Sequence, residues 1–219
     1  MSTTDSVSPL GLSLPQPALA RDRRAPRRRL QFAPAALALV TVLATHLFNF
    51  GSGSRIGLLD ASSSASWSHV LIAAILVLAT LTAATGLRLA RTQRAPWVAA
   101  AGILAFLAVA EISPLHASID RMAWGKLLYV PLLFVLGVCL WRLWAGAGAR
   151  SLVRTGLGTL ILSYAIHVLG PHVVQALGWG TGSWAYQVKV GLKQGTELAG
   201  WLLILLGLGS QLAARRTRH

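Results

Sequence analysis

The sequence predicts an all-α, polytopic membrane protein: a bundle of six transmembrane helices with both termini in the cytoplasm. Three observations predict it, namely the composition, six long apolar stretches and the placement of the arginines. Hydrophobic residues make up 54% of the 219 positions, charged residues only 12%, and the mean hydropathy is +0.60. Soluble domains carry roughly 25% charged residues. We therefore expect lipid, rather than one buried core, to surround most of these side chains.

Each apolar stretch holds close to the roughly 20 residues that are needed to cross a hydrocarbon core of about 30 Å. Tryptophans lie at or near most of the predicted ends, as in interfacial aromatic belts. Pro96 opens the third stretch, where its missing N–H costs nothing. The predicted spans are residues 30–50, 67–90, 96–115, 127–145, 152–176 and 184–212.

The basic residues predict the orientation of these spans. Arginines gather before the first span, after the second and fourth spans, and at the C-terminus. The opposite connections hold only Arg55, Arg121 and Lys126. The positive-inside rule then places both termini in the cytoplasm, and an even number of spans agrees with this alternation. We predict a multi-pass protein of the bacterial plasma membrane, with N-in and C-in topology.

The net charge of +14 follows the same topology, so we expect the lipid bilayer, and not nucleic acid, as the partner. Residues 1–29 are rich in Ser, Pro and Arg and predict a disordered basic arm. Residues 30–212 form the predicted transmembrane domain, and 213–219 a basic cytoplasmic tail. The single cysteine, Cys139, lies in an apolar run, which indicates a buried structural thiol.

Four ionisable residues inside the predicted spans share one depth. Glu111, His167, Glu197 and His46 each lie about 15 or 16 residues from a cytoplasmic end, or about 22–24 Å at the helical rise. Lys193 is about one turn further out. Charged groups at such depths usually face a protein interior or a cavity and mark functional sites. The sequence therefore predicts a polar site near the extracytoplasmic leaflet.

The neighbours of these residues predict some of their partners. Lys193 and Glu197 are four apart, so a structural ion pair is one interpretation and a functional site is the other. Glu111 has no basic residue at i±4, so its partner must come from another helix. Gly191, Gly195 and Ala199 form a ridge of small residues that would let a neighbouring helix approach closely. Gly170-Pro171 should break or kink the fifth span just beyond His167.

Two motifs carry a resemblance to a loose group of uncharacterised bacterial multipass membrane proteins. That group has Leu-Ser-x-Asp-Glu followed after four residues by His-Glu, and on a later helix Glu-Glu-x-x-Glu-x-x-Gly. Here Glu111 and His116 keep the first spacing, and Glu197 and Gly200 keep the second. The resemblance covers roughly residues 57–207, and implies the architecture and the position of the site but no activity.

Several carboxylates of that group are replaced in this chain. The substituted positions are Ala110, Ala117, Lys193 and Gln194. A site rich in carboxylate and imidazole could hold a metal ion, whereas a lysine repels one. The candidate metal ligands are His46, Glu111, His116, His167 and Glu197. The sequence does not decide whether any cofactor binds. A haem between His46 and His167 is a further alternative.

Three functions stay open on the sequence alone. The first is an enzyme acting on a small-molecule or lipid-borne substrate. Glu111 would be the general acid or base, and His46 and His167 would be metal ligands or proton shuttles. Lys193 would bind an anion beside Glu197. The second is a small proton-coupled transporter. The third is an accessory or assembly subunit whose polar groups bind a partner subunit in the membrane.

Overall fold

The structure is a computed structural model that describes residues 30–90, 93–113, 127, 129–143 and 147–216. Its described residues are helical, with turns and bends between helices and no strand. The helices are α2 (Ala33–Gly51), η2 (Gly57–Leu59), α3 (Trp67–Leu89), α4 (Arg94–Ile112), α6 (Tyr129–Arg142), α7 (Ala147–Ala176) and α8 (Trp184–Arg216). The predicted basic arm (residues 1–29) and His116 lie outside the described residues, and residues 213–216 of the predicted tail belong to α8.

Five of these helices are long and apolar enough to cross a membrane, namely α2, α3, α4, α7 and α8. The sixth apolar helix, α6, has 14 residues between Tyr129 and Arg142, fewer than the full crossing length predicted for residues 127–145. Side chains exposed along the long helices are largely Leu, Val and Ile. Large exposed apolar surface of this kind is stable against lipid rather than water.

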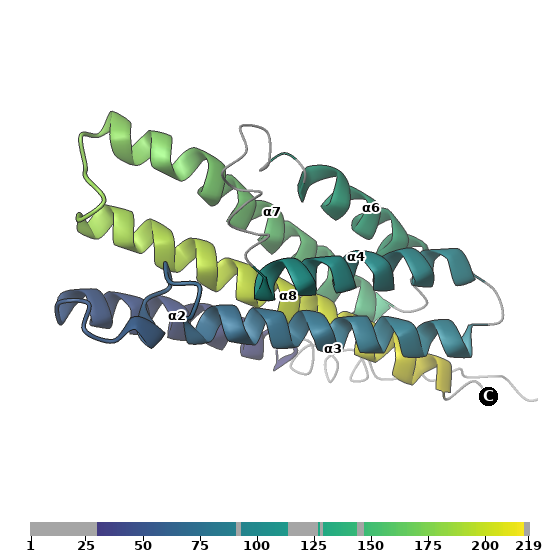
Figure 1. Cartoon of the computed structure of the whole chain (residues 1–219). Helices are drawn as coiled ribbons and strands as arrows, with labels where there is room; N and C mark the ends of the chain where they lie inside the picture. Colours follow the sequence, from purple (N-terminus) through teal and green to yellow (C-terminus); the bar gives the residue numbers. More distant parts are fainter. Residues whose placement is uncertain (1–29, 91–92, 114–126, 128, 144–146, 217–219) are drawn as a thin grey trace, which may run out of the picture.

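The helices pack as an elongated bundle around α8 (Figure 1). Helix α8 contacts α7, α2 and α3, while α4 lies along α3 and α6 lies along α4. Half of the apolar window of α8 is buried, more than in any other described candidate span. We call the end where α2, α4 and α7 finish and α3 and α8 begin the distal end. Helices α7 and α8 extend past the end of α4 in that direction (Figure 1).

Glycines allow α8 to approach both α2 and α7. A Cβ added at Gly191 or Gly195 would lie 2.8 Å from Leu43 or 2.7 Å from Leu39, both on α2. On the other face, a Cβ at Gly200 would lie 2.8 Å from Leu160 and 3.0 Å from the carbonyl oxygen of Gly156 on α7. The predicted small-residue ridge is therefore confirmed, with α2 as its neighbour.

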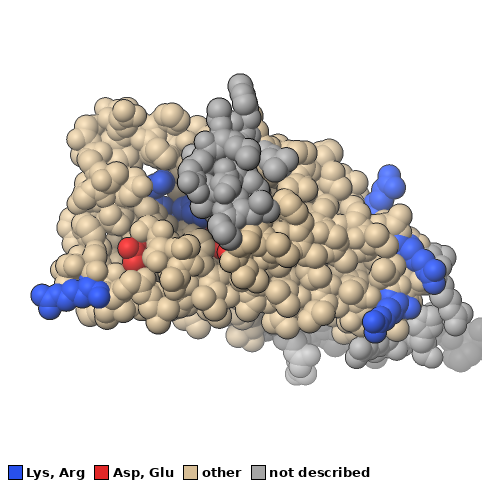
Figure 2. Space-filling view, in the orientation of Figure 1, with Lys and Arg blue, Asp and Glu red and all other residues tan. Residues whose placement is uncertain are grey.

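Local residues act at the start of α3 and within α7. Ser66 caps the start of α3, accepting a hydrogen bond from the backbone N–H of His69 at 3.4 Å. Helix α7 continues through Pro171 to Ala176, so the predicted break in the fifth span does not occur. Figure 2 shows basic side chains at both ends of the bundle, more of them at the end where α3 finishes and α4 begins, and basic and acidic side chains toward the other end.

Candidate functional site: a polar pocket with an apolar base

One pocket brings together most of the residues predicted as a site. It lies among α3, α4, α6, α7 and α8 and has a cavity volume of about 80 Å³. Since a bound water needs roughly 10–15 Å³, this is space for several waters or a small head group. Its polar lining comes from Glu111, Ser163, Tyr164, His167, Lys193 and Glu197.

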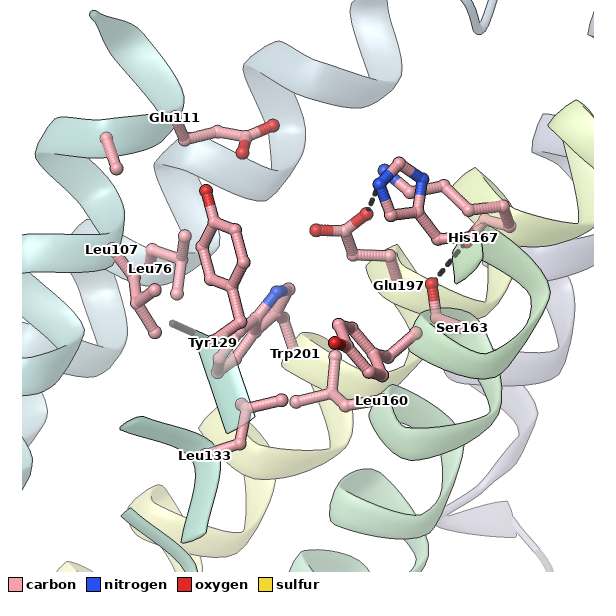
Figure 3. Close-up of a pocket in the computed structure, with 13 residues that line it drawn as sticks. Leu76, Leu107, Glu111, Tyr129, Leu133, Leu160, Ser163, His167, Glu197 and Trp201 are labelled. Carbon is pink, nitrogen blue, oxygen red and sulfur yellow. Dashed lines mark hydrogen bonds and ion pairs between the residues drawn. The ribbon is translucent and has the colours of Figure 1, made fainter. Parts of the chain in front are cut away.

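The remaining lining is apolar or aromatic and lies toward the opposite end of the bundle. Leu107 is one helical turn before Glu111 on α4, and Trp201 is one turn after Glu197 on α8. Leu160 precedes His167 by about two turns on α7. Leu76 and Leu133 complete this base (Figure 3). The pocket is therefore amphipathic along its length, with its polar part at the distal side.

The carboxylate of Glu111 has its partner on a different helix, as the sequence required. Glu111 lies in the last turn of α4, and its Oε1 is 2.5 Å from Nδ1 of His69 in the first turn of α3. The two side chains are 6% and 15% exposed, respectively. Among the described residues, His69 is the hydrogen-bonding partner of Glu111, so Oε2 is left for a molecule in the pocket.

The predicted i,i+4 pair on α8 is confirmed. Lys193 Nζ is 2.7 Å from Glu197 Oε2, an ion pair by distance although Oε2 does not meet hydrogen-bond geometry. The same ammonium donates to Oε1 of Gln194 at 3.2 Å. Ser163 on α7 donates to the backbone carbonyl of Lys193 at 2.8 Å, which holds α7 against this turn of α8. The positive charge of Lys193 is therefore already countered by protein groups.

Glu111 and Glu197 approach the pocket from opposite walls (Figure 3). Their carboxylates point toward one another, with the phenol of Tyr129 beside Glu111 and the imidazole of His167 above Glu197. The pocket thus offers acids, imidazole and phenol together, which are the usual groups of acid–base chemistry.

His46 shares the predicted depth but does not line this pocket. It is 2% exposed, and its Nδ1 accepts a hydrogen bond from the backbone N–H of Ala61 at 3.0 Å. Nε2 must then carry the proton in the neutral ring, and it donates to Oε1 of Gln187 at 3.0 Å. Both nitrogens are engaged, so this arrangement leaves neither for a metal ion or a haem. Within this arrangement, His46 fastens the α2–α3 connection to α8.

The polar and aromatic residues that line the pocket or bind its lining, but were not predicted as site residues, are His69, Tyr129, Ser163, Tyr164 and Trp201. A signal existed for His69, because α3 and α4 are joined by a short connection and run in opposite directions. The start of α3 and the end of α4 must then meet at one end. In the described part of the chain, no three His, Cys, Asp or Glu side chains are grouped as a metal site. His116 lies outside that part.

Comparison with known proteins adds no relative to this picture. No family model, curated protein or solved structure matches the chain.

Proposed function

We propose that the chain is an integral protein of the bacterial plasma membrane that binds a lipid-borne substrate in this pocket and acts on it by acid–base chemistry. The observation that carries the proposal is the amphipathic lining, with Glu111 and Glu197 at the polar end and leucines and Trp201 at the other. Such a lining suits a molecule with a polar head and an alkyl chain. Water alone would leave the apolar part of the pocket unfavourably solvated.

The proposed topology has six spans with both termini in the cytoplasm, and α6 as the sixth crossing helix. The basic side chains support it, since Figure 2 shows more of them at the end of the bundle opposite the distal end. The distal end then faces the extracytoplasmic side, and the polar part of the pocket lies in the outer leaflet. A head group could enter from that leaflet without crossing the hydrocarbon core.

Within the proposed reaction, Glu111 is the general acid or base. His69 holds Oε1 and thereby orients Oε2 toward the pocket. His167 is the second proton-transfer group, and the Lys193–Glu197 pair stabilises charge that develops on the head group. Positioned acid–base groups typically contribute about 10²–10⁴-fold to a rate.

Incubation of the purified protein with a bacterial total lipid extract, followed by mass spectrometry of the lipids, tests this proposal. We expect one lipid class to be converted by the wild type and the rate to fall at least about 10²-fold in Glu111→Gln. Gly158→Ala is the matched control, because a Cβ at Gly158 meets nothing within 4 Å. Conversion that is unchanged in Glu111→Gln, or no conversion of any lipid, would contradict the proposal.

A second candidate is a proton-coupled carrier, which the grouping of Glu111, His69, His167 and Glu197 around one pocket favours. The apolar base weighs against it, since protons would need a polar path beyond Leu76, Leu107 and Trp201. Flux of protons in liposomes under a pH gradient separates the two candidates. Flux that depends on Glu111, without conversion of any lipid, would favour the carrier.

A further inference from the structure

We infer that the pocket selects amphiphiles with a cationic amine head group over those with a neutral or anionic head. This inference rests on the proposed function, because it names the class of lipid-borne molecule that the same pocket takes. Three features of the lining carry it: the balance of charge, the free oxygen of Glu111, and the aromatic and apolar side chains below it.

The charge balance of the lining favours a cation. Glu111 and Glu197 contribute two carboxylates, and Lys193 contributes one ammonium, with the imidazoles counted as neutral. Lys193 is held by Glu197 at 2.7 Å and by Gln194 at 3.2 Å. An anionic head group would have to displace these partners and would also face the carboxylate of Glu111. An ammonium meets the carboxylate of Glu111 on one wall, and on the other wall it meets Glu197, whose charge is shared with Lys193.

Glu111 supplies the acceptor that an ammonium requires. Its side chain is only 6% exposed, and its Oε1 is bound by His69. Oε2 of this buried side chain has no partner among the described residues, and the side chain lines the cavity. Oε2 is not among the fully buried polar atoms that lack a partner, so it is accessible to a molecule in the cavity. A bound ammonium would satisfy it with a charge-assisted hydrogen bond, which is about twice as strong as a neutral one.

The rest of the lining suits the carbon atoms next to such a head group. Tyr129 and Trp201 offer aromatic faces, which attract an ammonium and its neighbouring CH₂ groups. Leu76, Leu107 and Leu133 form the apolar base against which an alkyl chain can pack. The cavity of about 80 Å³ holds a compact head group rather than a large one.

Calorimetric titration of the full-length protein in nanodiscs with dodecylamine, dodecanol and dodecanoate tests the inference. These probes share one chain and differ in head-group charge. We expect dodecylamine to bind about tenfold more tightly than dodecanol, and dodecanoate to bind most weakly. In Glu111→Gln the affinity for dodecylamine should fall to that for dodecanol, while the affinity for dodecanol should stay unchanged. Gly158→Ala should keep the wild-type order.

A double variant that removes both carboxylates of the lining provides the second test. In Glu111→Gln/Glu197→Gln, Lys193 no longer faces a carboxylate on either wall, so dodecanoate should become the tightest of the three probes. Equal binding of all three probes to the wild type would overturn the amine preference and leave the proposed function standing. Tightest binding of dodecanoate to the wild type would also overturn it. Absence of binding by every probe would overturn both.

Discussion

His69 and Glu111 are 42 positions apart in the chain, and their side chains meet at 2.5 Å between Nδ1 and Oε1. This contact joins the first turn of α3 to the last turn of α4 at the distal end of the bundle. It also fixes the orientation of a nearly buried carboxylate whose second oxygen is open to the pocket. The pair is therefore both a structural contact and part of the proposed site.

Replacing His69 should destabilise the protein more than its lost packing explains. In His69→Ala the carboxylate of Glu111 stays desolvated without its partner, which costs about 1–3 kcal/mol. Denaturant unfolding in detergent of His69→Ala, Glu111→Ala and the double variant measures the coupling. We expect a coupling energy of about 0.5–3 kcal/mol. Free energies of unfolding that add without any coupling would show that the contact contributes nothing to stability.

Close packing of α7 on α8 predicts opposite outcomes for two glycines of α7. A Cβ at Gly156 would lie 2.9 Å from the carbonyl oxygen of Gly200, whereas a Cβ at Gly158 meets nothing within 4 Å. Gly156→Ala should lower the free energy of unfolding by about 1–3 kcal/mol. Gly158→Ala should be neutral or slightly stabilising, because alanine is the better helix former. The same unfolding assay checks both, and equal effects would contradict the helix contact.

His46 should hold the α2–α3 connection in place. Its imidazole accepts a hydrogen bond from the backbone N–H of Ala61. His46→Ala leaves that donor unsatisfied, which should shift the equilibrium toward an open connection by about 1–3 kcal/mol. Trypsin cleavage after the exposed Arg55 reports such opening and should become about tenfold faster.

Thr45→Ala is the matched control for that experiment. Within the described residues, the Thr45 hydroxyl donates to carbonyls of its own helix, at Thr41 and Val42. Cleavage after Arg55 should therefore keep the wild-type rate. Equal rates in His46→Ala and the wild type would show that His46 does not restrain the connection.

Much of the architecture could be predicted from the sequence because a helix that crosses a bilayer needs roughly 20 apolar residues, which are visible as long apolar stretches. The predicted ranges 67–90 and 184–212 lie within a few residues of α3 and α8. Counting residues from predicted ends also brought Glu111, His167 and Glu197 to one depth, and all three line the pocket.

Depth alone could not tell which face of a helix a side chain occupies. His46 has the predicted depth but faces Ala61 and Gln187, away from the lining of the pocket. His69 is not among the residues that the sequence predicts as a site, because its pairing with Glu111 depends on how α3 and α4 rotate about their own axes. That rotation is set by packing, such as Trp97 of α4 against Gly86 of α3, which no single-helix pattern reveals.

Accessibility of introduced cysteines in right-side-out vesicles tests most directly whether Glu197 lines a pocket that opens to the outer leaflet. In a Cys139→Ser background, Glu197→Cys should react with a small membrane-impermeant thiol reagent added outside, and dodecylamine should slow the reaction. Ser64→Cys, exposed in the α2–α3 connection, should react without such protection, and Ser151→Cys, exposed near the start of α7, should not react from outside. A cysteine at position 197 that reacts only from the cytoplasmic side, or that dodecylamine does not protect, would contradict the account.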